Sequence, residues 1–265
     1  PRLVAAQVYD PLGDKTTFRP VIKQNSETGA FEVSVPRPAG AFRPGLYRMH
    51  LELLVGLQVF VSDLDFTWGV LVINTNQSIY APGDRAYLQM AALSKFGHTL
   101  CNAHLSLEIT SPDQAITMLD TAAGTIDRSR TCRGDNVTDE PDYFAYYRTD
   151  LPGSYTLRLS NLDTGYRVED SFLVQAKNPL TLERISATRI NPFLADYTMR
   201  LKLTAEKDFS GELVETVPAD FEIVDGQETL TWPINIRAGE TQEFSYTYHA
   251  PPVSPQIYLL GPVTL

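Results

Sequence analysis

The sequence lacks the features of several large classes of protein. It has no apolar run of the roughly 20 residues that a membrane-spanning helix needs. The longest apolar-rich stretch, LELLVGLQVF (51–60), is too short and contains Glu52 and Gln58. Basic clusters are absent too, since 22 Lys and Arg stand against 32 Asp and Glu, a net charge of −10. We therefore expect no membrane insertion and no nucleic-acid partner.

Motifs of enzymatic chemistry are also missing. The sequence contains no GxSxG, Walker or GxGxxG pattern, and Gly-rich loops are absent. Its four histidines show neither HxH nor HExxH spacing: His50, His98, His104 and His249. We therefore expect a protein that is not an enzyme, with no catalytic and no cofactor-binding residues.

Cysteine is scarce, with Cys101 and Cys132 as its two occurrences. Their spacing fits no CxxC metal or redox motif, so they are either two free thiols or one disulfide. We expect the disulfide, because the other features of the sequence indicate an extracellular protein.

Helical periodicity is almost absent as well, and period-two alternation takes its place. Apolar side chains alternate with polar ones in five segments: FEVSV (31–35), YTLRL (155–159), MRLKL (199–203), WPINI (232–236) and FSYTY (244–248). Turn clusters such as NSETG, APGD and NLDTG separate the alternating segments. Many short strands between such turns predict an all-β protein built from sandwiches.

An internal repeat predicts the domain organisation. The segment 29–53 is similar to 142–160, and VFVSDLDFTW (59–68) parallels YRVEDSFLVQ (166–175). A third unit of different pattern follows Asn178-Pro179. We expect three tandem β-sandwiches, covering residues 1–68, 69–177 and 178–265.

The first predicted domain is incomplete, because it has no counterpart of two strands that open the second, in 69–84 and 85–100. Left alone, it would expose sheet edges and apolar faces. The missing strands belong either to an upstream part of a longer polypeptide or to another chain that adds them. The expected partners are accordingly proteins, either neighbouring domains or copies of this chain.

Residues 69–175 resemble a macroglobulin-like domain of the MG2 type, as found in the α2-macroglobulin family and in bacterial surface proteins. The resemblance is carried by VINTNQSIYAPGDRAYLQMAAL (72–93), FGHTLCNAHLSLEITSPD (96–113) and PGSYTLRL (152–159). Residues 1–68 resemble the second half of the same domain, and 178–265 resemble immunoglobulin-type modules. The family's Cys-Gly-Glu-Gln thioester is absent, since Asn102 follows Cys101 and Arg133 follows Cys132.

One loop gathers three candidate sites. The acids Asp135, Asp139, Glu140 and Asp142 are calcium candidates, although they lack the order of an EF-hand loop. Arg133-Gly134-Asp135 matches an integrin-binding tripeptide, but we interpret it as a turn held by the disulfide. Glycosylation sequons begin at Asn76 and Asn136. Two other acidic segments, SDLDF (62–66) and NLDTG (161–165), are predicted to be turns.

Two hypotheses for the function follow. The first is a structural or adhesion segment of an extracellular or cell-surface protein, a rod of sandwiches that strand complementation could join into a fibre. The alternative is a set of accessory domains of a larger secreted enzyme or macroglobulin-type trap, whose active part lies outside this segment.

Overall fold

A computed structural model describes residues 2–25, 28–36, 41–133, 138, 140–175, 179–224 and 230–265, with the backbone alone for 2–4. Across these residues the chain forms 21 strands and no helix, so the predicted all-β class is confirmed. Accordingly, no helix that could span a membrane occurs in the described part. The chain divides into two compact units, which are described separately.

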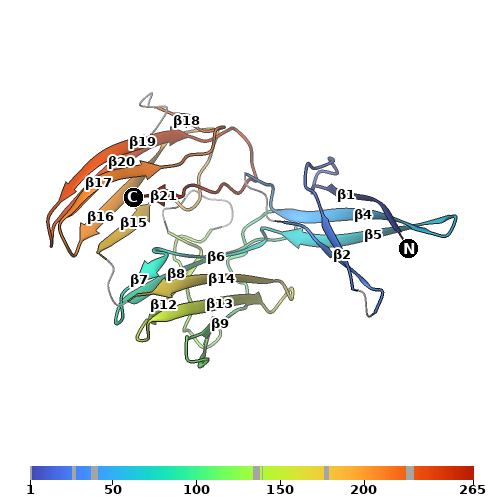
Figure 1. Ribbon diagram of the computed structural model, residues 1–265, viewed down its shortest axis with the longest axis horizontal. Coiled ribbons are helices and arrows are strands. Elements are labelled where there is room, and N and C mark those ends of the chain that lie inside the picture. The colour runs from blue at the N-terminus through green and yellow to red at the C-terminus, as the bar shows by residue number, and fades with distance from the viewer. Residues whose placement is uncertain are drawn as a thin grey trace. The chain divides into compact units, whose positions relative to one another are not determined.

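The first compact unit contains Pro1–Val70, Leu93–Gly97 and Pro255–Leu259. Its main sheet is antiparallel, in the order β1 (Arg2–Tyr9), β4 (Gly45–Val55), β5 (Gln58–Trp68). A separate hairpin consists of β2 (Val21–Gln24) and β3 (Phe31–Ser34). Figure 1 shows β4 and β5 as a long hairpin whose turn points away from the rest of this sheet.

The core of the first unit lies against one half of the main sheet. Val8, Tyr47, Met49 and Leu51 are buried there, all on one face by the alternation of β1 and β4. Phe18, Val33 and Val35 cover them from the side of the β2–β3 hairpin, and Phe66 and Trp68 flank them from β5. These core side chains therefore cover the half of the main sheet that lies farther from the β4–β5 turn.

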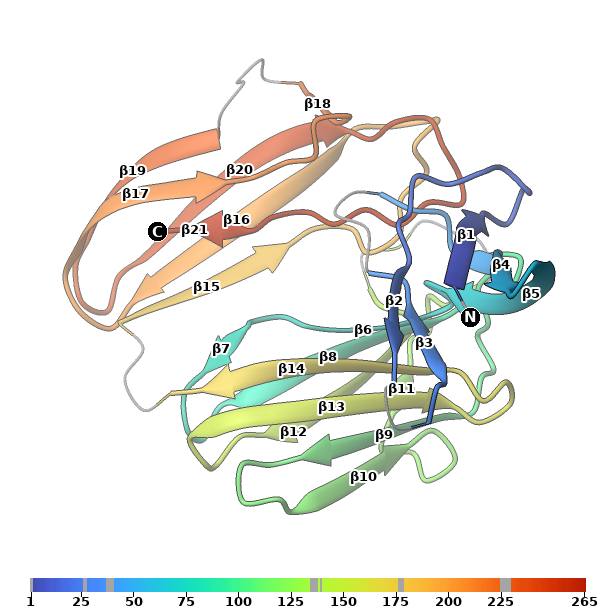
Figure 2. The ribbon, with the colours of Figure 1, turned by 45° about the vertical axis from the view of Figure 1, so that its right-hand side comes forward.

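The second compact unit contains Leu71–Ala92, His98–Ser254 and Leu260–Leu265. Two of its sheets form a sandwich, seen in Figure 2. One sheet has the order β10 (Ile116–Asp120), β9 (Leu105–Thr110), β13 (Gly153–Asn161), β14 (Arg167–Val174), β7 (Ile79–Tyr80). The other has the order β11 (Asp127–Arg128), β12 (Tyr143–Arg148), β8 (Arg85–Ala92), β6 (Leu71–Thr75).

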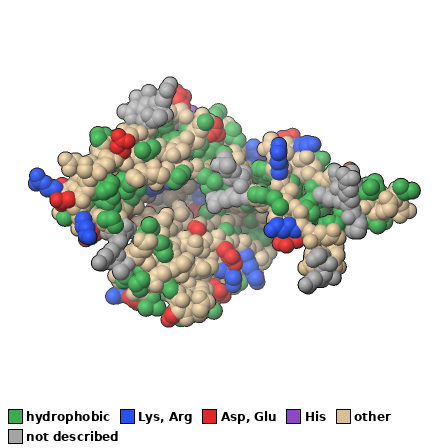
Figure 3. All heavy atoms as spheres, viewed as in Figure 1, with side chains coloured by type: hydrophobic (Ala, Val, Ile, Leu, Met, Phe, Trp, Pro, Cys, Tyr) green, Lys and Arg blue, Asp and Glu red, His purple; other side chains and the backbone are tan. Residues whose placement is uncertain are grey.

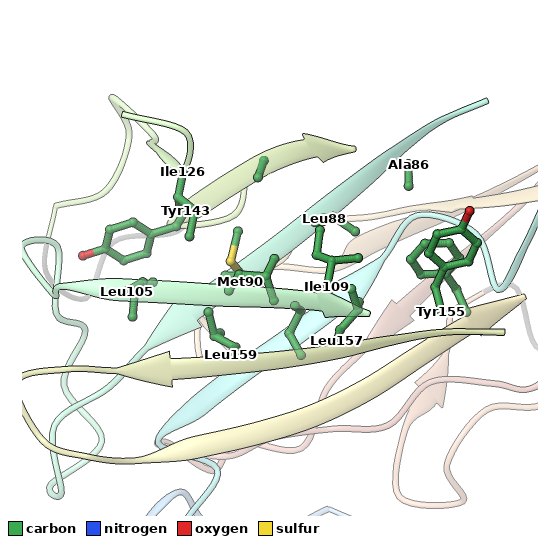
Figure 4. Packing of buried hydrophobic residues seen from close by; sticks show 14 of the residues in the cluster. Ala86, Leu88, Met90, Leu105, Ile109, Ile126, Tyr143, Tyr155, Leu157 and Leu159 are labelled. Atoms are coloured by element: carbon green, nitrogen blue, oxygen red, sulfur yellow. The ribbon is translucent and has the colours of Figure 1, made fainter. Parts of the chain in front are cut away.

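The core of this sandwich follows from alternation on both sheets. Every second residue of β8 and β9 is buried, as are Leu157 and Leu159 of β13. Figure 4 shows these side chains meeting between the strands. Aromatic rings close one end, where Tyr155 and Phe172 stack with centroids 4.9 Å apart.

The remaining strands of the second unit form another pair of sheets. Their orders are β15 (Leu180–Ile185), β16 (Tyr197–Ala205), β20 (Thr241–His249), β18 (Glu222–Ile223), and β19 (Leu230–Ile236), β17 (Phe209–Glu215), β21 (Val263–Thr264). Leu201, Leu203, Leu213, Ile234 and Tyr246 are buried between them. The predicted domain boundaries at 68/69 and 177/178 stay a prediction. The two compact units are made of several separate chain segments each, and their bounds do not test these boundaries.

Four of the five alternating segments lie entirely in strands, namely β13, β16, β19 and β20, and the fifth, 31–35, lies in β3 except for its last residue. The prediction for NLDTG is confirmed, since residues 162–164 form the turn after β13. The prediction for SDLDF was wrong, because residues 62–66 lie inside β5 and pair with β4. Asp63 and Asp65 there face the solvent side and pair with β4 side chains, so their charge is compatible with a strand.

Candidate interaction surface

The β4–β5 hairpin is closed by a two-residue turn. Val55 pairs with Gln58 across Gly56 and Leu57, and Gly56 has a positive φ of 65°. A glycine adopts this conformation at no steric cost, which explains its position between two apolar strands. The register continues without a shift to Gly45 and Trp68, so each β5 residue has a defined partner on β4.

Half of β5 carries apolar side chains that remain about half exposed and that none of the described core residues of the first unit covers. Four of them are between 47% and 59% exposed: Val59, Phe60, Val61 and Leu64. Leu57 in the turn is fully exposed, and Figure 3 shows hydrophobic side chains at this end of the hairpin. Phe66 and Trp68 of the same strand are half-buried, since they lie where the core cover reaches. A soluble chain seldom exposes so many neighbouring apolar residues unless they meet a partner.

The outer edge of β5 is open. In the described part of the chain, β5 forms a ladder with β4 alone. Because Val55 and Gln58 close the turn as a hydrogen-bonded pair, even-numbered β5 residues direct their N–H and C=O groups to β4. Val59, Val61, Asp63 and Asp65 direct theirs outward. The same parity on β4 is seen at Leu46, whose N–H points away from β5 and donates to the Lys95 carbonyl over 3.1 Å.

A charged ladder lies on the solvent face of the same hairpin. Arg48 pairs with Asp65 at 3.0 Å, and His50 Nδ1 lies 2.7 Å from Asp63 Oδ1. These residues are direct cross-strand neighbours. The hydrogen bond with Asp63 raises the pKa of His50, which increases the share of the charged imidazolium near neutral pH. Each of the two aspartates of β5 thus has a basic cross-strand partner on β4.

A groove of about 690 Å³ lies over this ladder, within the first unit. Arg48, His50, Asp63 and Asp65 line it together with residues such as Phe96. These four side chains form two ion pairs, and the lining also includes Asp10, Arg43 and Lys95, so charges of both signs face the groove. We assign it no ligand.

The predicted disulfide is present. Cys101 and Cys132 are joined, with sulfur atoms 2.05 Å apart. It connects the turn before β9 to the loop between β11 and β12. Arg133 belongs to the described part of that loop, whereas Gly134, Asp135 and Asn136 lie outside the described residues. The interpretation of the tripeptide as a pinned turn and the glycosylation of Asn136 stay predictions.

Two calcium candidates can be placed, while Asp135 and Asp139 lie outside the described residues. Glu140 accepts hydrogen bonds from Ser129 Oγ at 2.5 Å and from Thr131 Oγ1 at 3.2 Å. Asp142 is buried and forms an ion pair with Arg189. Among the described residues, no group of three or more His, Cys, Asp and Glu side chains could hold a metal ion. Calcium binding stays a prediction.

Asn76, the other sequon residue, has a structural role. Its Oδ1 accepts hydrogen bonds from the Tyr80 hydroxyl at 2.7 Å and from the Tyr87 N–H at 3.2 Å. Its Nδ2 donates to Glu183 Oε1 over 3.2 Å. A glycan on Nδ2 would compete with that last bond.

The aromatic strand β12 has the two faces that alternation implies. Tyr143 and Ala145 are buried in the core, and Phe144 and Tyr146 lie on the opposite face with Tyr87. The Tyr146 ring is 5.1 Å from that of Tyr87, and the Arg85 guanidinium lies 3.9 Å from its centroid. Neighbours thus pack against the ring, but Tyr146 is still 45% exposed, so the cluster lies at the surface of the second unit.

A buried polar cluster that the sequence did not reveal lies in the last pair of sheets. Glu215 Oε1 accepts hydrogen bonds from Arg184 and from the Tyr246 hydroxyl, the latter at 3.0 Å. Arg184 also donates to the Leu260 carbonyl over 2.6 Å, next to strand β21. Burial raises the pKa of Glu215, and the nearby Arg184 acts in the opposite direction. The cluster connects three strands and the C-terminal segment.

Comparisons with known proteins show fold likenesses only. No family model matches the chain, and no curated protein matches its sequence. Among solved structures, an E. coli α2-macroglobulin in its native conformation is 12% identical, with a TM-score of 0.30, over 92% of this chain and 16% of that one. A DUF4785 family protein from Legionella pneumophila is also 12% identical, with a TM-score of 0.29, over 92% and 69%.

A Salmonella α2-macroglobulin mutant is 9% identical, with a TM-score of 0.22, over 94% of this chain and 26% of that one. The chain thus spans about a quarter or less of the two macroglobulins. At these scores the likenesses do not establish a family, and the resemblance of 69–175 to an MG2-type domain stays a prediction.

Proposed function

We propose that this chain is a non-enzymatic interaction segment of a larger extracytoplasmic protein, and that its first unit binds a protein partner by strand addition at the β5 edge. The observation that carries the proposal is the combination on one strand of outward backbone groups and uncovered apolar side chains. Added strands gain main-chain hydrogen bonds from such an edge and gain specificity from alternate side chains.

The disulfide supports the compartment. Disulfides persist in oxidising environments, such as the extracellular space and the bacterial periplasm, and are rare in the cytosol. We also propose that the protein is exposed at a cell surface and has a role in adhesion. The charged groups described above form structural pairs, which suits an interaction segment better than a catalytic one.

Two further hypotheses for the role of the β5 edge stay predictions: a fibre, and accessory domains of a larger protein. A fibre requires a strand other than β5 to dock on the β5 edge of the next copy, so that the contact does not close. Accessory domains of a macroglobulin-type protein or of a secreted enzyme would use the same edge against another part of a longer chain.

The proposal is tested by comparing two positions on one face of β5. Phe60→Ser removes an uncovered side chain, and Phe66→Ser removes one packed against the core. In the dilute chain we expect Phe60→Ser to change the free energy of unfolding by less than about 0.5 kcal/mol. Phe66→Ser should lower it by roughly 2–4 kcal/mol. Urea denaturation measures both values.

Equal losses at the two positions would contradict the proposal. Phe60 would then stabilise the chain's own fold, and its exposure would need no partner. Leu64→Ser serves as a repeat of the Phe60 test, because Leu64 lies on the same face and is also uncovered.

A further inference from the structure

The β5 edge is complementary to a second copy of itself. We propose that two copies of this chain pair through their β5 strands, antiparallel, in the register that places Ser62 opposite its own counterpart. The inference rests on the open edge of the proposed function and adds the identity of the partner.

Backbone geometry allows this register. A two-fold axis at Ser62 brings Val61 opposite Asp63 of the second copy, and Val59 opposite Asp65. All four residues direct their N–H and C=O groups outward, so they can exchange hydrogen bonds in pairs. Ser62 and its counterpart then form a non-hydrogen-bonded pair, the kind in which opposite Cα atoms lie closest.

Side chains favour the same register. Phe60 meets Leu64 of the second copy, and this pair occurs twice, on either side of the two serines. Both residues lie on the core-side face of β5 and are about half exposed in the single chain. Pairing therefore places uncovered apolar side chains against each other.

The two neighbouring registers are less favourable, one because of charge repulsion and the other because an apolar side chain would face a polar one. An axis at Asp63 would set that carboxylate opposite its own counterpart, which is destabilising. An axis at Val61 would set Leu64 opposite Gln58. In the proposed register Asp63 and Asp65 face valines, while His50 and Arg48 of their own chain balance their charge.

The contact is isologous, because the same strand contributes to both sides. It joins the two main sheets into one continuous sheet and closes, since neither β5 edge remains free. The expected product is a dimer and not an open chain of copies.

The register is tested by cross-linking. Ser62→Cys should form an intermolecular disulfide on mild oxidation, since opposite non-hydrogen-bonded residues meet the Cα spacing that a disulfide needs. Gln58→Cys is the matched control, exposed on the same face of the same strand but opposite Phe66 of the second copy. Mass spectrometry of the non-reduced protein identifies the link. Equal cross-linking of both variants, or none at Ser62→Cys, overturns the register.

The dimer is tested by sedimentation velocity. The unmodified chain should form a concentration-dependent dimer below about 100 μM, as a micromolar Kd requires. Val61→Pro removes an outward N–H twice per dimer and should raise Kd at least about tenfold relative to Val61→Thr. A monomer at all concentrations, or a ladder of larger species, overturns the pairing. If Phe60→Ser meanwhile leaves the stability of the dilute chain unchanged, the open edge stands and only the identity of the partner is wrong.

Discussion

At the scale of single residues, Cys101 and Cys132 link two segments that are separated by 31 positions in the sequence. Cys101 lies in the turn before β9, and Cys132 lies in the loop between β11 and β12. Our inference that the protein works in an oxidising compartment depends on this disulfide.

Removing the disulfide should destabilise the chain. We expect the Cys101→Ser/Cys132→Ser variant to lose about 3–4 kcal/mol in free energy of unfolding, because closing a loop of this length restricts the unfolded state. Urea denaturation measures the loss. Thiol titration of the unfolded, non-reduced protein should find no reactive cysteine, and two reactive thiols would contradict the link.

Two buried carboxylates show what residue-level sequence reasoning missed. Asp142 stood out as a calcium candidate because acids surround it in the sequence, yet its carboxylate pairs with Arg189. Glu215 pairs with Arg184. In both cases the partner comes from a different element, and neither alternation nor spacing predicts such a pairing. Burial raises the pKa of both carboxyl groups, so each depends on its arginine to remain charged.

At the scale of elements, the β4–β5 hairpin contains the strand that we propose as the interaction site. By composition LELLVGLQVF is a single apolar-rich stretch, but Gly56 in its middle is a turn signal between two strands. Apolar residues at three successive positions, Val59, Phe60 and Val61, place apolar side chains on both faces of β5. Those two signals together could have predicted an uncovered strand from the sequence.

The direction of the β5 backbone groups predicts opposite outcomes for adjacent prolines. Ser62→Pro removes an N–H that donates to β4 and should lower the free energy of unfolding by about 1–3 kcal/mol. Val61→Pro removes an outward N–H and should cost under about 1 kcal/mol in the dilute chain. Urea denaturation compares the two, and a larger loss for Val61→Pro would reverse the assigned direction.

Most strands were predictable because they have one buried and one wet face. YTLRL and MRLKL alternate for that reason, and β13 and β16 bury Leu157 and Leu201 accordingly. SDLDF misled because serine and aspartate are common in turns. Its register beside Arg48 and His50 depends on pairing across the hairpin, which composition does not reveal. The parallel pairing of β7 with β14 is non-local in the same way.

At the scale of the whole molecule, the chain is a series of sheets in which the first is covered on only part of one face. The incomplete first sandwich that the unequal repeat indicates stays a prediction. Among the described residues, the apolar side chains of β5 and of the hairpin end lie beyond the reach of Phe18, Val33 and Val35. The net charge of −10 opposes non-specific association of copies through this exposed apolar surface.

Amide hydrogen exchange along β5 measures whether the outer edge of this strand is open. In the chain at a concentration where it is monomeric, protection should alternate from one residue to the next. The outward amides of Val59, Val61 and Asp63 should exchange at nearly unprotected rates, while those of Phe60 and Ser62 exchange slowly through their bonds to β4. Equal protection of all five amides in the dilute monomer would show that the edge is already covered and that β5 is not a site of strand addition.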